Sequence, residues 1–114
     1  MKSFEVFART GEVRDNCGKE AFEHICGRPL GLTFDASGNL IVADAYKGLL
    51  SFDKNGNKTV LVTEVENRKL TFANSVTIGN NGIIYFTDSS AFFERRRVPL
   101  ELLDGYVFRL CYYL

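Results

Sequence analysis

The sequence of 114 residues predicts an all-β chain built from repeated antiparallel units. First, residues 29–44 align with residues 73–88 at a constant offset, so that Asp44 falls on Asp88. Second, each copy consists of an apolar strand, a polar turn with glycine and another apolar strand. Third, a period of about 40 to 50 residues built from short strands is typical of propeller blades, which bury their faces against neighbouring blades. The chain is therefore predicted to be a partial β-propeller of about two antiparallel four-stranded blades.

The first two regions are predicted from strand and turn signals. Residues 1–27 are expected to hold the outer strand of a preceding blade, at 4–8, followed by an irregular polar loop. Residues 28–66 are expected to form a complete blade, with Gly38 and Gly56 at the left-handed positions of its turns. Its four strands are expected at residues 30–34, 39–43, 48–52 and 59–65. Four consecutive antiparallel strands with short turns make one blade.

The third region, residues 67–114, is predicted to form a partial blade. Its strands are expected at residues 74–78, 83–87 and 106–114. A polar insertion at 89–104 delays the third of these strands, and the fourth strand of the blade is missing.

Several of these strands are apolar on both faces, as in the stretches 40–42 and 83–86. Such strands suit a sheet that lies between other sheets. Two isolated blades would expose an apolar flank and unprotected edges, so we expect the chain by itself to self-associate or to be poorly soluble.

Composition excludes some classes of partner. The chain has 14 basic and 14 acidic residues and a formal net charge of zero, so no electrostatic attraction to nucleic acid or to an anionic membrane surface is expected. No apolar run approaches the roughly 20 residues that span a bilayer, so no transmembrane segment is predicted here. The N-terminus lacks the apolar centre of a signal peptide, which says nothing about a longer parent protein.

The cysteines leave two readings open. Cys17 and Cys26 bracket a short polar loop, and either a disulfide in an oxidising compartment or two free thiols fits the sequence equally well. Cys111 is the third cysteine. Asn57 begins an Asn-Lys-Thr glycosylation sequon in a predicted turn, which slightly favours the oxidising compartment.

Three motifs resemble the strictosidine synthase-like family, closest to its branch of adipocyte plasma membrane-associated proteins. They are the segments 26–32, 42–50 and 84–90, which read CGRPLGL, VADAYKGLL and IYFTDSS, and the resemblance extends from about Phe4 to Arg109. It implies a six-bladed propeller, in which the remaining blades are partners of this chain. It also implies a small-molecule substrate for the parent protein.

The resemblance carries further expectations. The family has a cysteine pair just before this blade, which favours a bridge between Cys17 and Cys26. It implies a parent in the secretory pathway, either membrane-associated, extracellular or vacuolar. The resemblance ends near Phe108, where relatives have glycine, so we expect a truncated sequence.

Catalysis by this chain alone is not predicted. In the strictosidine synthase that names the family, a glutamate on a late blade is the acid/base of a Pictet–Spengler condensation, and no glutamate here matches it. The adipocyte-type branch implies arylesterase-like hydrolysis instead, similar to calcium-dependent paraoxonases and gluconolactonases. The parent is therefore expected to be a hydrolase or a Pictet–Spengler-type enzyme. The alternative is a non-catalytic propeller that binds a partner through its loops.

Asn74 is the candidate metal ligand. In the metal-binding propellers that the chain resembles, an Asn-Asp pair opens an inner strand and places the Asn oxygen in the central channel, where Ca²⁺ accepts such ligands. Here Ser75 replaces the aspartate. The competing interpretation is an asparagine that bonds nearby backbone at a strand start.

Two further sets of charged residues have structural interpretations. Asp44 and Asp88 recur at equivalent positions, which favours carboxylates that accept backbone N–H groups at the following turn. The triplet Arg95–Arg97 is either a solvated loop or part of a lid over the channel.

Overall fold

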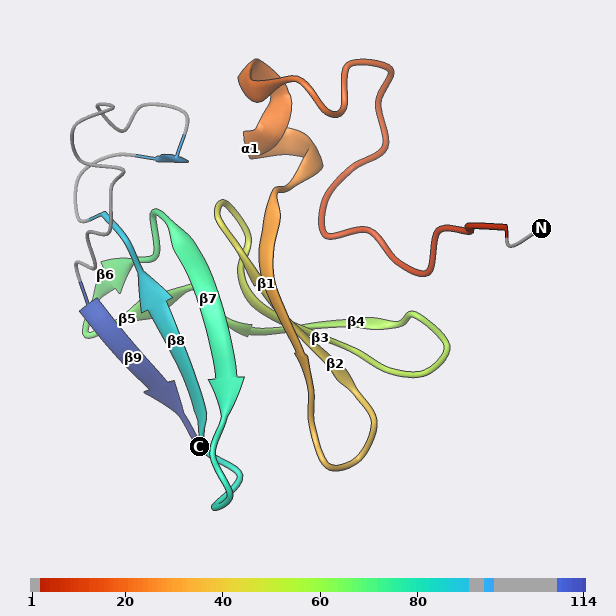
Figure 1. The fold of residues 1–114 in the computed structure, drawn as a ribbon. Coiled ribbons are helices and arrows are strands. Elements are labelled where there is room, and N and C mark those ends of the chain that lie inside the picture. Colours follow the sequence, from red (N-terminus) through yellow and green to blue (C-terminus); the bar gives the residue numbers. More distant parts are fainter. Residues whose placement is uncertain (1–2, 91–93, 96–108) are drawn as a thin grey trace.

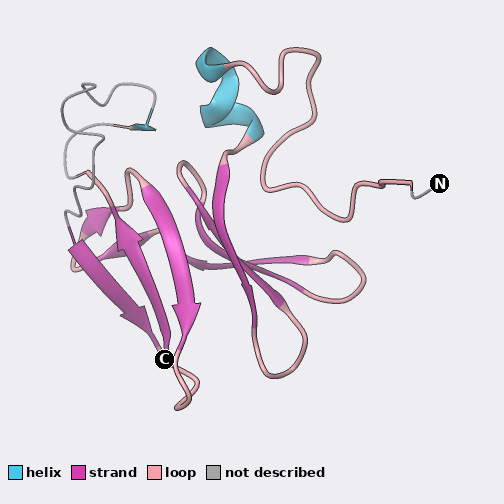
Figure 2. Ribbon diagram, viewed as in Figure 1, coloured by secondary structure: helices cyan, strands magenta, loops and turns pink. Residues whose placement is uncertain are grey.

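A computed structural model describes residues 3–90, 94–95 and 109–114 of the chain. These residues form two antiparallel sheets, a two-stranded hairpin and a short helical segment (Figures 1 and 2). The elements are η1 (Glu20–Phe22), α1 (Glu23–Cys26), β1 (Pro29–Phe34), β2 (Leu40–Asp44), β3 (Gly48–Phe52), β4 (Lys58–Val62), β5 (Glu64–Val65), β6 (Arg68–Lys69), β7 (Ala73–Ile78), β8 (Ile84–Asp88) and β9 (Arg109–Tyr113). The all-β prediction is confirmed, whereas the number of blades in a complete ring stays a prediction.

The first sheet has the strand order β1-β2-β3-β4, with every neighbouring pair antiparallel. Its two central strands are buried along most of their length, on both faces. This burial agrees with the continuous apolar runs in their sequences, which suit a sheet covered on both sides.

Two turns of this sheet share one hydrogen-bonded design. In the β1–β2 turn, Oδ1 of Asp35 accepts the backbone N–H of Asn39 at 2.8 Å, and Oδ2 accepts its side-chain amide at 3.1 Å. In the β3–β4 turn, Asp53 accepts the corresponding groups of Asn57 at 3.0 Å each. The repeated pattern Asp-x-x-Gly-Asn therefore specifies one turn geometry twice, with Asp and Asn closing the loop between them.

These hydrogen bonds lower the pKa of both aspartates. Desolvation raises the pKa of Asp35, but the bonds from Asn39 and nearby backbone N–H groups together bring it below its ordinary value of 3.8. For Asp53, the backbone N–H of Asn57 is the largest cause of a lowered pKa, followed by the Asn57 side chain. Each bond favours the charged carboxylate over the protonated acid.

We expect acid to weaken the fold partly through these two turns. A carboxyl group whose pKa is lowered by folding stabilises the native state above its unfolded pKa, and this stabilisation is lost as the pH falls through the native pKa. The free energy of unfolding should therefore decrease as the pH is lowered below about 4. In the double variant Asp35→Asn/Asp53→Asn, urea titrations monitored by circular dichroism should show a smaller decrease over that range. Equal decreases in both proteins would contradict the assignment.

The second sheet has the order β7-β8-β9 and repeats the first in detail. Gly79 N–H donates to Ile83 O at 2.9 Å, as Asp35 N–H donates to Asn39 O at 2.9 Å one repeat earlier. The strand predicted at 106–114 is observed from Arg109 to Tyr113, and residues 106–108 lie outside the described part. Most of the predicted insertion lies outside it as well.

The main core lies between the two sheets. Its buried members come from both sheets and from the segment before β7: Ile41, Leu49, Leu70, Ile84, Phe86 and Cys111. A smaller cluster covers the opposite face of the first sheet and contains Val42, Leu50 and Phe52, against which Ala8 packs. The first sheet is thus covered on one face by the second sheet and partly on the other by the N-terminal segment.

β1 and β7 are the neighbouring inner strands of the two sheets (Figure 1). They approach so closely at Gly31 that a β-carbon there would lie 2.7 Å from the backbone oxygen of Asn74 and 3.0 Å from Cα of Ser75. Glycine is required at this position by space, because both neighbours are backbone atoms of the facing strand.

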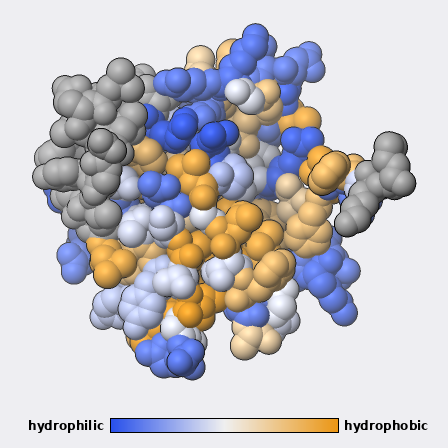
Figure 3. All heavy atoms as spheres, viewed as in Figure 1, coloured by the Kyte–Doolittle hydropathy of each residue, from blue (hydrophilic) through white to orange (hydrophobic). Residues whose placement is uncertain are grey.

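The other face of β1 is uncovered. Leu32 is 62% exposed and Phe34 is 69% exposed. Figure 3 shows apolar residues gathered across the middle of the face on which β1 and β7 lie in front. One repeat later, Val76 and Ile78 occupy the matching positions and pack against the main core. The outer face of the first sheet therefore carries apolar side chains at the same positions at which the second sheet packs against the first.

Residues 1–27 were expected to hold the outer strand of a preceding blade, and that assignment stays a prediction. Residues 4–8 form no strand in the described structure, because an extended segment becomes a strand only when a neighbour supplies its hydrogen bonds. The loop that follows contains η1 and α1, which were not predicted. The boundary placed between residues 66 and 67 falls in the turn of the β5–β6 hairpin, where both residues have positive φ.

Candidate functional site

Polar side chains gather at the end of the sheets where β1 and β7 begin. The strand pairs place Pro29 opposite Asp44 and Ala73 opposite Asp88, so β2 and β8 end where the inner strands start. In Figure 1, α1 lies at this same end, directly before β1. In an open propeller, loops at one end of the inner strands surround the central channel, so this end is the candidate site.

Asp44 and Asp88 are fully buried at this end, and both accept hydrogen bonds from backbone N–H groups. Oδ1 of Asp44 accepts the N–H groups of Tyr46 and Lys47 in the following turn, at 2.9 and 3.0 Å, and Oδ2 accepts that of Arg28 at 2.8 Å. The predicted structural role is thus confirmed for Asp44.

Asp88 makes the equivalent long-range contact. Its Oδ1 accepts the N–H of Phe72 at 2.8 Å, one repeat beyond the bond from Arg28 to Asp44. Each carboxylate therefore ties the residue before an inner strand to the end of the neighbouring strand, which fixes where that inner strand begins.

Asn74, the predicted metal ligand, is the second residue of β7 and is half-buried. Its side-chain amide donates to Oγ of Ser89 at 3.3 Å. This bond turns the NH₂ group toward the end of β8 and engages one of its hydrogens. The amide thus bonds a side-chain hydroxyl and not the backbone that the competing interpretation named. The amide oxygen is a suitable ligand for a hard cation, and the metal role stays a prediction.

The described residues do not make up a calcium site by themselves. Calcium takes six to eight oxygen ligands, and Asn74 offers one side-chain oxygen. Within residues 3–90, 94–95 and 109–114, no three His, Cys, Asp or Glu side chains lie close enough to hold a metal ion. A metal at Asn74 would need most of its ligands from residues beyond those described.

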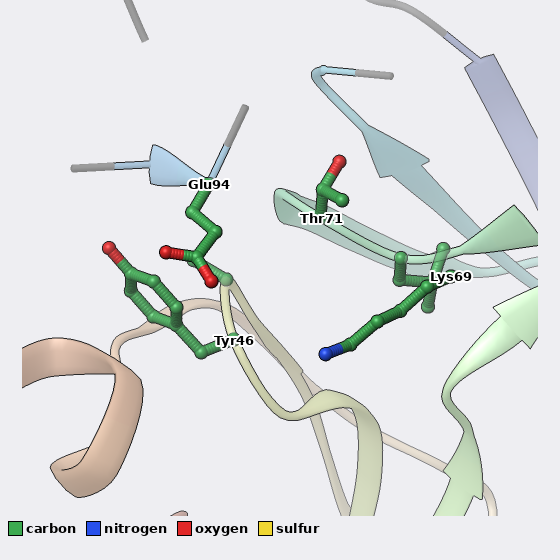
Figure 4. A pocket seen from close by; sticks show the side chains of 6 residues that line it. Tyr46, Lys69, Thr71 and Glu94 are labelled. Carbon is green, nitrogen blue, oxygen red and sulfur yellow. The ribbon is translucent and has the colours of Figure 1, made fainter. Parts of the chain in front are cut away.

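A pocket of about 140 Å³ opens near this end, between the two sheets and the segment that carries Glu94. It is lined by Ala45, Tyr46, Lys69, Leu70, Thr71 and Glu94. In Figure 4 the side chains of Glu94 and Tyr46 lie on one side and those of Lys69 and Thr71 on the other, with the Lys69 ammonium extending toward Tyr46. A carboxylate, an ammonium group and two hydroxyls can together orient a small polar molecule.

Glu23 is the acidic residue that the sequence analysis missed. It lies in α1 and is only 7% exposed, and its carboxylate accepts two hydrogen bonds of 2.8 Å from Nη1 of Arg95. Arg95 is therefore paired, unlike the solvated loop residue that was one of its two predicted roles. The other two arginines of the triplet lie outside the described residues. Nothing in the sequence marks Glu23, because its partners are distant in the chain.

Cys17 and Cys26 form a disulfide with a Cα–Cα distance of 5.6 Å. The bridge closes the loop that contains η1 and α1, and a cleft of about 230 Å³ borders it. Cys111 is buried and forms no disulfide within the described residues. The disulfide therefore holds α1 as part of a short closed loop next to the start of β1.

Asn57, the predicted glycosylation residue, is exposed beside the outermost strand of the first sheet. Its side-chain nitrogen donates to Oδ2 of Asp53 at 3.0 Å. The position is accessible from solvent and far along the sheet from β1, so glycosylation there stays a prediction.

The helices of the described residues are all too short or too polar to cross a membrane. No protein-family model matches the chain. The chain is similar to known proteins in two other comparisons, one of sequence and one of structure.

The sequence relatives come from a plant and from a mammal. The chain is 42% identical over 106 residues to strictosidine synthase-like protein 2 of Arabidopsis thaliana, which covers 87% of this chain and 28% of that protein. It is also 42% identical over 106 residues to the adipocyte plasma membrane-associated protein of Bos taurus, covering 89% of this chain and 25% of that protein. The chain therefore spans about a quarter of the length of these relatives.

One structural neighbour is a gluconolactonase from Xanthomonas campestris, a β-propeller. Its similarity covers 54% of this chain and 21% of the gluconolactonase, with a TM-score of 0.50 and 24% sequence identity. This likeness supports the fold alone and agrees with the antiparallel sheets described above. Identities of 42% over most of its residues place this chain in the strictosidine synthase-like family.

Proposed function

We propose that the complete protein is a hydrolase of small ester-like substrates, and that this chain contributes part of its substrate-binding end. The carrying observation is that Asn74 and the polar pocket lie near the same end of the inner strands. The arylesterase-like activity that the family resemblance implies also supports this proposal. The late-blade glutamate of a Pictet–Spengler enzyme has no counterpart here, so that chemistry receives no support from this chain's own residues.

In this proposal the chain binds and orients the substrate. The Lys69 ammonium can donate hydrogen bonds to ester oxygens, whereas the hydroxyls of Tyr46 and Thr71, which donate to Glu23 and to Ser90 O, can accept them from a substrate. Asn74 would supply one oxygen ligand to a calcium ion, and a bound divalent cation polarises a carbonyl oxygen. The side chain of Leu70 gives the pocket an apolar wall, which favours a substrate with a small hydrocarbon part.

The test is a calcium titration and an ester-substrate screen on the complete protein. Asn74→Ala is expected to weaken calcium binding by about tenfold or more, because one ligand oxygen is lost. Asn80→Ala is the matched control, since Asn80 is an exposed amide in the β7–β8 turn of the same sheet. Unchanged calcium affinity in Asn74→Ala would remove Asn74 from the site. A complete protein that neither binds calcium nor cleaves esters would favour the non-catalytic partner-binding alternative.

We also propose that the complete protein enters the secretory pathway. The Cys17–Cys26 disulfide suits an oxidising compartment, and Asn57 of the sequon is exposed. One relative is named as a plasma membrane-associated protein. Mass spectrometry of the peptide that contains Asn57, before and after removal of N-linked glycans, measures its occupancy in protein from secreting cells. An unmodified Asn57 together with two free thiols would argue against this compartment.

A further inference from the structure

Glu23 differs from the other buried acids of the described residues. Asp44 and Asp88 occupy equivalent positions in the repeat and bind backbone N–H groups. One repeat after Glu23 stands Asn67, which lies in the exposed turn of the β5–β6 hairpin. The contacts of Glu23 are therefore specific to this end of the molecule and are not part of the repeated architecture.

The Glu23 carboxylate contacts two segments that are distant in sequence and one residue that follows it closely. Its Oε1 accepts the hydroxyl of Tyr46 from the β2–β3 turn at 3.1 Å. Both of its oxygens accept Nη1 of Arg95 at 2.8 Å, and Oε2 lies 3.5 Å from Nε of Arg28, directly before β1. The Glu23 side chain is only 9% exposed, so these bonds are largely shielded from water.

One of these partners, Tyr46, lines the pocket in Figure 4. Arg95 directly follows Glu94, which lines the pocket on the same side as Tyr46. Glu23 does not line the pocket. It binds the Tyr46 hydroxyl and Arg95, the residue adjacent to Glu94, so it can hold two segments that are far apart in the sequence next to each other on one side of the pocket.

Glu23 is itself held firmly in place. The disulfide closes the loop that carries α1, and Lys47 Nζ donates to the backbone oxygen of His24 at 3.0 Å. The N–H of Glu12 donates to Ile25 O at 3.0 Å. A helix of four residues has little stability of its own, so these contacts are what keep the carboxylate in position.

We propose that Glu23 is the positioning residue of this pocket. Its carboxylate couples Tyr46 to the segment of Glu94 and Arg95, so that the pocket has its shape only while both bonds are made. The use of the pocket for a small polar substrate rests on the proposed function. The coupling itself does not, because it is measured on the chain without a ligand.

The experiment follows the ring resonances of Tyr46 by NMR in the 114-residue chain. Four proteins are compared with the wild type: Glu23→Gln, Arg95→Gln, the double variant, and Glu12→Gln as a control. Glu12 is an exposed acid of the same region that pairs with Arg14, and its side chain is 64% exposed. If the chain associates at NMR concentrations, the same variants are compared in the complete protein.

Glu23→Gln and Arg95→Gln are each expected to shift the Tyr46 ring signals, whereas Glu12→Gln is not. Arg95→Gln should have no further effect once Glu23 is replaced, because its influence on Tyr46 passes through that carboxylate. Denaturation of the same proteins should show a coupling of roughly 2- to 100-fold in the folding equilibrium constant between Glu23 and Arg95.

Two results would overturn the proposal. One is a Tyr46 signal that responds to Arg95→Gln equally with and without Glu23. The other is a Glu23→Gln variant in which the signals of core residues such as Phe86 move as much as those of Tyr46, which would indicate a general loss of packing. Neither result bears on calcium binding or ester cleavage, so this proposal and the proposed function can fail separately.

Discussion

Asp44→Ala is expected to lower the free energy of unfolding by about 3 to 5 kcal/mol, because three backbone N–H groups lose their acceptor in a buried place. The groups belong to Arg28, Tyr46 and Lys47, and their distances to the carboxylate are 2.8, 2.9 and 3.0 Å. Asp44 is 0% exposed, so water does not readily replace the lost oxygens. Urea denaturation monitored by circular dichroism measures the loss.

Asp35→Ala is the control for Asp44→Ala. Asp35 also accepts backbone N–H groups, at 2.8 and 2.9 Å, but in a turn that is open to solvent. Water can satisfy these donors, so a loss of only about 1 kcal/mol is expected. If the two variants were equally stable, burial would not be the reason for the importance of Asp44.

Gly31→Ala is expected to destabilise the fold by about 2 to 3 kcal/mol, because the added methyl group overlaps the facing strand. The new carbon would lie 2.7 Å from Asn74 O, 3.0 Å from Ser75 Cα and 3.1 Å from Val76 N. All three are backbone atoms, so relief requires the two inner strands to move apart. We also expect displacement of Asn74, which thermal denaturation combined with NMR of its side-chain amide can detect.

Gly38→Ala is the matched control for Gly31→Ala. Gly38 has a φ of +85° and no atom within 4 Å of the position of a β-carbon. Its replacement is expected to cost about 1 kcal/mol through the left-handed backbone alone, with the Asn74 amide signal unchanged. A stable Gly31→Ala variant with an unmoved Asn74 signal would show that β1 and β7 are less closely packed than described.

Most of the sheet structure could be predicted because each element is specified locally. The strand predicted at 48–52 was found with the same bounds, and those at 30–34 and 83–87 shifted by one residue at one or both ends. Short apolar runs and the glycine-containing turns between them carry this information within a few neighbouring positions. Because residues 73–88 repeat the pattern of residues 29–44, the strands and the turn recognised in the first copy could also be predicted in the second.

The N-terminal region could not be predicted in the same way. Residues 4–8 have an apolar pattern typical of a strand, but the described structure offers them no neighbour with which to pair. The helical segment around Glu23 is too short for a periodic signal. Its position depends on a disulfide and on contacts with Tyr46 and Arg95, which sequence spacing does not reveal.

The candidate site was predicted in part. Asn74 was found at the start of an inner strand, as expected from its place in the repeat, and Asp44 was correctly assigned to the backbone. The pocket was not foreseen, because its lining residues come from three segments that only the folded chain brings together. The pairing of Arg95 with Glu23 joins residues that lie on different segments, so net charge and charge runs could not indicate it.

The correspondence between Leu32 and Val76, and between Phe34 and Ile78, has a consequence for how such proteins grow. The first sheet already presents, on its outward side, apolar side chains at the positions with which the second sheet contacts the first. Tandem duplication of the DNA that encodes one sheet would thus add a sheet whose contact surface is already present in the existing sequence. A propeller of this kind could then gain or lose whole blades, because no new pair of complementary surfaces has to evolve first.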